Sequence, residues 1–168
     1  MLGKLTRWLR ILGHDTTYSS NIDDPRLIEI AKEEGRTLLT KDLELYRQAL
    51  TKRVRAFYLQ GTTEEERLAE LSRRFNLELG VNVTTSRCPK CNTEVKPIPR
   101  AEAIDRVEES TSAYYQEFWE CPECSQVYWQ GAHWKRIRKT LQTATEKVKS
   151  RRPNETQDKR RHWEESQI

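Results

Sequence analysis

Four cysteines in two matching pairs constrain this chain more than any other feature of its sequence. The motifs CPKC at residues 88–91 and CPEC at residues 121–124 contain all of its cysteines. A Cys-x-x-Cys turn presents two sulfurs to one ion, and two such turns complete the tetrahedron of thiolates found in structural zinc ribbons. Four thiolates leave no open coordination position, so we expect one structural zinc per chain, which replaces a core that this module is too small to build. The expected ligands are Cys88, Cys91, Cys121 and Cys124.

Disulfide bonds and a redox-active motif are the alternatives to a metal site. Disulfides are disfavoured because nothing in the sequence indicates secretion. The N-terminal segment MLGKLTRWLR is amphipathic and lacks the apolar run of a signal peptide, and no stretch approaches eighteen apolar residues. A redox role is less expected still. Two matched motifs in one small module need a single explanation that covers both, and a shared metal ion provides it. We therefore expect a cytoplasmic protein with no membrane partner.

Ahead of the cysteines, the apolar pattern alternates between helix and strand. The first helix places its leucines and Trp8 on one face and Lys4, Arg7 and Arg10 on the other. Asp24 and Pro25 suit the N-cap and first turn of the second helix. Such alternation indicates a parallel sheet with helices on both faces. Helices are expected at residues 2–12, 24–34, 43–50 and 63–75, and strands at residues 15–18, 37–40 and 54–59.

The pattern changes after Gly80, which divides the chain into three parts. An α/β domain is expected over residues 1–80, a zinc ribbon over 81–138, and a basic, partly disordered tail over 139–168, entered by a helix that begins near Ala132. The α/β part begins with a helix, whereas such sheets usually begin with a strand.

Positive charge is concentrated at the C-terminal end. Residues 132–168 contain eleven Lys and Arg against five Asp and Glu, a net charge of +6, whereas the rest of the chain has nineteen against twenty-one, a net charge of −2. Basic tails commonly bind nucleic acid through its phosphates, although a solvated extension has the same composition.

Seven aromatic residues fall between residues 114 and 134, beside several cations. Aromatic and basic side chains together can stack on unpaired bases and hold phosphates. The rings can equally fill the small core of the ribbon, and we expect most of them to do so, with about two exposed. The candidate RNA-binding residues are Lys4, Arg7, Lys41, Trp129, His133, Trp134, Lys135, Arg136 and Arg138.

Acidic residues follow two of the predicted strands. Asp42 comes directly after the strand in RTLLTKD, and Asp23 and Asp24 follow the strand at residues 15–18. The carboxyl ends of parallel strands are where ligands and metals bind. Carboxylates gathered there can hold Mg²⁺ or Mn²⁺ for phosphodiester cleavage. Helix capping explains the same residues equally well, so both interpretations stay open.

Four segments, taken in order, resemble the Mut-seven C-terminal RNase domain family: MLGKLTRWLRILGHDTTYSSNIDD, EGRTLLTKD, SRCPKCN and FWECPECSQVYWQGAHW. The resemblance covers roughly residues 1–138. That family joins a PIN-like nuclease fold to a C-terminal zinc ribbon. The resemblance therefore implies a ribonuclease dependent on Mg²⁺ or Mn²⁺, with Asp24 and Asp42 as metal-binding acids, Asp23 as a helper, and the four cysteines on zinc.

Two departures from the family pattern bear on activity. Family members usually have a first strand that ends in an aspartate two residues before the Met of MLGKL, and the sequence given begins at that Met. Asn21 stands where members often have another acid. Poor metal binding is expected as a result, together with cleavage that is lost or much slowed. The alternative function is a non-catalytic RNA- or ribosome-binding protein with a degenerate site. A toxin-like nuclease is a third, weaker interpretation, against which the zinc ribbon argues mildly.

Overall fold

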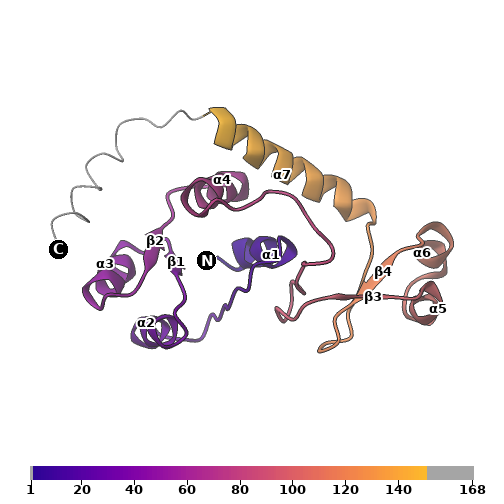
Figure 1. The fold of residues 1–168 in the computed structure, drawn as a ribbon, viewed down its shortest axis with the longest axis horizontal. Coiled ribbons are helices and arrows are strands. Elements are labelled where there is room, and N and C mark those ends of the chain that lie inside the picture. The colour runs from indigo at the N-terminus through magenta and orange to yellow at the C-terminus, as the bar shows by residue number, and fades with distance from the viewer. Residues whose placement is uncertain (1, 151–168) are drawn as a thin grey trace.

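The computed structural model describes residues 2–150 of the 168-residue chain, and within them the predicted alternation of helix and strand is largely present (Figure 1). The first part of the chain contains α1 (Gly3–Ile11), α2 (Asp24–Glu33), β1 (Leu38–Thr40), α3 (Leu43–Thr51), β2 (Ala56–Tyr58) and α4 (Glu64–Phe75). The second part contains β3 (Lys96–Ile98), α5 (Arg100–Ala103), the 3₁₀ turn η1 (Ile104–Arg106), α6 (Glu109–Tyr114), β4 (Phe118–Glu120), β5 (Val127–Tyr128) and α7 (Ala132–Ser150).

A small parallel sheet organises the α/β part. Strand β1 pairs with β2, with Leu38 opposite Ala56 and Thr40 opposite Tyr58, and α3 makes the connection between them. Helices flank the sheet, which confirms the predicted α/β class. The boundaries follow local chemistry. Thr63 and Glu66 form a complete capping box at the start of α4, and α2 is followed by Gly35 with a positive φ of 62°.

The strand predicted at residues 15–18 is wrong, because these residues form no strand in the structure. The backbone groups of Thr16 bond to side chains instead of to a neighbouring strand. Its N–H donates to Asn92 Oδ1 at 3.0 Å, and its carbonyl oxygen accepts from Arg10 Nε at 2.9 Å. Both partners are side chains from other parts of the chain. These tertiary contacts override the preference of the residues at 15–18 for a β-strand.

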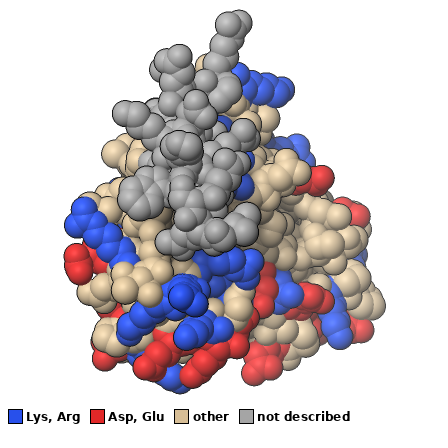
Figure 2. Space-filling view, turned by 60° about the vertical axis from the view of Figure 1, so that its left-hand side comes forward, with Lys and Arg blue, Asp and Glu red and all other residues tan. Residues whose placement is uncertain are grey.

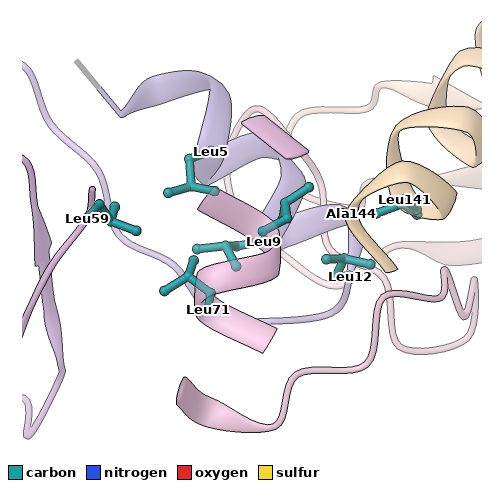
Figure 3. Close-up of a cluster of buried hydrophobic side chains, with 8 residues drawn as sticks. Leu5, Leu9, Leu12, Leu59, Leu71, Leu141 and Ala144 are labelled. Atoms are coloured by element: carbon teal, nitrogen blue, oxygen red, sulfur yellow. The ribbon is translucent and has the colours of Figure 1, made fainter. Parts of the chain in front are cut away.

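The main hydrophobic core lies among α1, α4 and α7 (Figure 3). The leucine face predicted for the first helix is confirmed. Its buried members are Leu5, Leu9 and Leu12, and Leu71 of α4 packs in the same cluster. Each fully buried leucine stabilises the fold by roughly 1.5–3 kcal/mol. A second cluster joins α2 and α3 around Ile28 and Ala49, beneath the other side of the sheet.

Helix α7 belongs to this core over much of its length. Leu141 and Ala144 are buried in the cluster with α1 and α4. Lys147 of α7 pairs with Glu66 of α4 at 3.5 Å, and Arg73 donates to the carbonyl oxygen of Lys147 at 3.1 Å. The boundary predicted between residues 138 and 139 therefore falls inside α7. The rest of the predicted tail, residues 151–168, lies outside the described residues.

The ribbon is built on an antiparallel sheet of order β3-β4-β5. Phe118 and Val127 are buried between its strands and the helical segment at residues 100–114, which packs through Ala103. This segment is inserted between β3 and β4, and it accounts for the long spacer between the two cysteine motifs. Tyr114 at its end is 77% exposed, whereas Phe118 and Trp119 are buried.

Candidate functional site

The two cysteine motifs form matching turns. In the first, Asn92 N–H donates to the carbonyl oxygen of Cys88 at 2.9 Å, and in the second, Ser125 N–H donates to that of Cys121 at 2.8 Å. Asn92 and Ser125 have positive φ angles of 75° and 55°. The reversal of the chain at these two residues brings both sulfurs of each motif to the same side.

The four predicted cysteines come together as a single cluster. Their sulfurs all lie within 4.8 Å of one another, with Cys88 to Cys124 at 3.6 Å and Cys91 to Cys121 at 3.3 Å. A tetrahedral zinc with bonds of about 2.3 Å requires sulfur separations of about 3.8 Å, so the cluster fits a metal ion of this kind. Among residues 2–150, no other group of three or more potential ligands is this close.

The environment of the sulfurs differs across the cluster. A backbone N–H bond from Thr93 lowers the pKa of Cys91 to about 6, whereas burial raises the pKa of Cys121 to about 12. The hydroxyl of Tyr128 lies 3.0 Å from Cys88 Sγ, and burial raises the pKa of Tyr128, so it stays protonated and can donate to a thiolate. Tyr128 was not among the predicted site residues.

Arg10 connects this cluster to the α/β part. Its guanidinium donates from Nη1 to the carbonyl oxygens of Pro89 at 3.1 Å and Lys90 at 2.9 Å, inside the first cysteine motif. Its own carbonyl oxygen accepts from Arg87 N–H at 2.8 Å. The sequence places Arg10 on the face of the first helix opposite the leucines, yet Arg10 is buried there and only 8% exposed. The helical period places it near that face, but the ribbon covers it.

Asn92 makes a second connection. Its side-chain oxygen accepts from Thr16 N–H, and its amide donates to Asp15 Oδ1 at 2.6 Å. Asp15 also accepts from Arg36 at 2.9 Å, just before β1. The two donors, Arg36 first, hold the pKa of Asp15 below its usual value. The segment that leads to Asp23 and Asp24 is therefore fixed at its start by the cysteine turn.

The three predicted acids are exposed and lie at helix N-termini. Asp23, rather than Asp24 as predicted, is the N-cap of α2, and it accepts from Arg26 N–H at 3.0 Å. Asp42 caps α3, with its Oδ1 accepting from Glu44 N–H at 2.7 Å and Leu45 N–H at 3.0 Å. The capping interpretation is correct for both. It uses a single oxygen of each carboxylate, and no hydrogen bond to the side chain of Asp24 is present among residues 2–150.

The topology brings these N-termini to one edge. Helix α2 leads through Gly35 into β1. Since a helix that precedes a parallel strand runs antiparallel to that strand, we expect the first residues of α2 at the carboxyl end of β1, on the same edge as Asp42. The same edge includes the turn after β2, where Lys41 Nζ donates to the carbonyl oxygen of Gly61 at 3.2 Å. The ammonium group of Lys41 therefore hydrogen-bonds to the backbone of this turn. The three aspartates are not close enough together to form a three-carboxylate metal-binding cluster. Among the described residues, the four cysteines are the only group of three or more potential metal ligands that lie this close to one another.

The other candidate RNA-binding residues lie on two helices and at the ribbon exit. Lys4 and Arg7 are exposed on α1, and Trp129 packs half-buried against the ribbon core. On α7, Trp134 is half-buried, and the remaining candidates are exposed: His133, Lys135, Arg136 and Arg138. The face in Figure 2, which brings forward the left-hand side of Figure 1, shows Lys and Arg mixed with Asp and Glu over its lower part.

A small parallel sheet with acids at its helix N-termini, joined to a four-cysteine cluster positioned to bind a metal ion, defines the class of this α/β protein. The model of the Mut7-C RNAse domain matches residues 1–141, and the chain belongs to this family. This confirms the family predicted from the sequence motifs. Comparison with curated proteins and with solved structures gives no match. Among residues 2–150, no helix combines the length and apolar character needed to cross a membrane.

Proposed function

We propose that this protein is a ribonuclease that cleaves RNA at the sheet edge formed by the N-termini of α2 and α3. The observation that supports the proposal is the position of Asp24 and Asp42 at one edge of the sheet, in a chain of the Mut7-C RNAse domain family. RNA is the substrate class that the family implies. The four cysteines hold a structural zinc in this proposal, because their sulfurs fill all four positions.

The acids fit a weakly held divalent cation. Asp42 uses only Oδ1 for capping, so its Oδ2 is available, and Asp24 is exposed at the same edge. Mg²⁺ in nucleases is commonly held by one or two carboxylates together with substrate phosphates, and it keeps several waters. When bound, such an ion polarises the phosphate and lowers the pKa of an attacking water. Asp24 and Asp42 would hold it, and Asp23 would fix the start of α2 beside them.

Incubation of the zinc-loaded protein with end-labelled single-stranded RNA tests the proposal. Shorter fragments should appear with Mn²⁺ and not in its absence. RNA that remains intact at every Mn²⁺ concentration would contradict it.

A second function is favoured by the geometry of the acids. Two of the three aspartates cap helices, and the three do not form a three-carboxylate cluster. A protein that binds RNA, free or in the ribosome, without cutting it needs no such cluster. Binding of single-stranded RNA with no fragments in the presence of Mn²⁺ would select this function over the ribonuclease.

A further inference from the structure

A groove of about 670 Å³ runs along α7 and is not part of the acid-bearing edge. One wall is α7 and the other is the segment after α4, at residues 79–81. Trp134 lines the groove at its ribbon end, beside Gln130, and Lys149 lines it at the other end. From Trp134 to Lys149 the helix rises by roughly 22 Å. The groove thus extends along about four turns of α7, a length that suits an extended single strand of nucleic acid.

The side chains that line the groove combine an aromatic ring with cations and amides. Trp134 is followed one turn later by Arg138 and two turns later by Gln142. Of the six Lys and Arg of residues 132–150, Arg138 and Lys149 line the groove. The single acid of this helix, Glu146, lines it too and accepts a hydrogen bond from Gln142. An aromatic ring with cations beside it is the arrangement by which proteins hold unpaired bases and their phosphates.

The far end of α7 reaches the carboxyl edge of the sheet. Lys147 and Ser150 line a neighbouring hollow together with Gln60 and Gly61, which lie in the turn after β2. Gly61 in turn accepts the hydrogen bond from Lys41, the residue before Asp42. A single strand of RNA that binds along α7 from Trp134 would therefore extend toward the edge of the sheet where the acids are.

We infer that the groove along α7 binds a single-stranded segment of the RNA substrate, with one base stacked on Trp134 and phosphates beside Arg138 and Lys149. This inference rests on the proposed function, because it takes RNA as the substrate. Stacking on Trp134 requires an unpaired base, so duplex RNA is a poor ligand for the groove.

Fluorescence anisotropy with a labelled 12-nucleotide single-stranded RNA, measured without added Mg²⁺ or Mn²⁺, tests the groove. Trp134→Ala should weaken the Kd about tenfold, the size of one stacking contact, and Trp134→Phe should restore part of it. Arg138→Gln should reduce the slope of log Kd against log salt by about one phosphate contact. Matched controls are Tyr114→Ala, which removes an exposed aromatic of the ribbon, and Arg47→Gln, which removes an exposed cation of α3.

Gly80 offers a test that leaves Trp134 in place. It lines the groove, and a Cβ added there meets no atom within 4 Å. Gly80→Glu should weaken RNA binding by repulsion, whereas Gly80→Lys should strengthen it, and a blunt-ended duplex should respond to neither substitution.

If wild type binds RNA and both Trp134→Ala and Gly80→Glu bind it equally well, the inference that the groove binds RNA is overturned. The ribonuclease proposal is left intact by that result. Tight binding of the duplex through the same residues also overturns it. If wild type binds no RNA, both proposals fail.

Discussion

The guanidinium of Arg10, in α1, donates a hydrogen bond of 2.9 Å to the carbonyl oxygen of Lys90, inside the first cysteine turn. Leu5 and Leu9 of the same helix are buried in the main core. One helix therefore connects the first cysteine turn with the core of the α/β part, and we expect the stability of the two parts to be coupled.

Replacement of Arg10 by Met should test this coupling. The change removes three hydrogen bonds to backbone carbonyl oxygens and should lower the free energy of unfolding by about 2–4 kcal/mol. Arg7→Met, on the exposed face of the same helix, should change it by less than about 0.5 kcal/mol. Chemical denaturation of the zinc-loaded proteins measures both. Equal stability of the two variants would show that the parts are independent.

The two residues with positive φ in the cysteine turns should respond differently to glycine. Ser125→Gly relieves left-handed backbone strain and removes no side-chain hydrogen bond, so its melting temperature should stay level or rise slightly. Asn92→Gly relieves the same strain but loses the bonds to Thr16 and Asp15, so its melting temperature should fall. Both should retain their metal. A fall of similar size in both variants would mean that Asn92 acts only through its backbone.

Elemental analysis should find one zinc per chain, and Cys121→Ser should lose it. Tyr128→Phe should keep the zinc but release it faster to a chelator, because it removes the donor beside Cys88 and partners of this kind change affinity by roughly 10- to 100-fold. A zinc content near zero, with the cysteines joined in disulfides, would refute the metal site.

Glu66 should make the protein sensitive to acid. Bonds from the Thr62 hydroxyl and from the backbone of Thr62 and Thr63 lower its pKa to about 2. A depressed carboxyl pKa stabilises the fold above the unfolded value near 4.5, and this stabilisation is lost as the pH falls toward 2. Wild type should therefore melt above Glu66→Gln at pH 6, and the two should converge near pH 2. A difference independent of pH would assign the effect to packing.

The parts of the fold that depend on neighbouring residues could be predicted from the sequence. The leucine face of α1, the Thr63 capping box and the paired cysteine turns each arise within a few residues of chain. The burial of Arg10 could not be predicted in this way, because its partners at residues 89 and 90 come from a separate module. The same holds for Leu141 of α7, whose basic surroundings resemble a solvated tail.

The site was predictable to a similar extent. The cysteines share one spacing, so their convergence follows from the motif. Asp42 follows a strand and precedes a helix, and that position suits both a cap and a metal ligand. Its single free oxygen became apparent only from the hydrogen bonds of the folded turn. No local signal marks Tyr128, since the strand pairing of β4 and β5 determines where its hydroxyl lies.

The rate of RNA cleavage by Asp42→Asn tests the central proposal most directly. Asn caps a helix about as well as Asp, so the variant should melt within a few degrees of wild type, and its side-chain oxygen can still accept from Glu44 and Leu45. If Asp42 holds the cation, Mn²⁺-dependent cleavage of single-stranded RNA should fall at least a hundredfold, while RNA affinity without Mn²⁺ is retained. Cleavage by Asp42→Asn at the wild-type rate would show that Asp42 is a helix cap only, and that the sheet edge is not the active site.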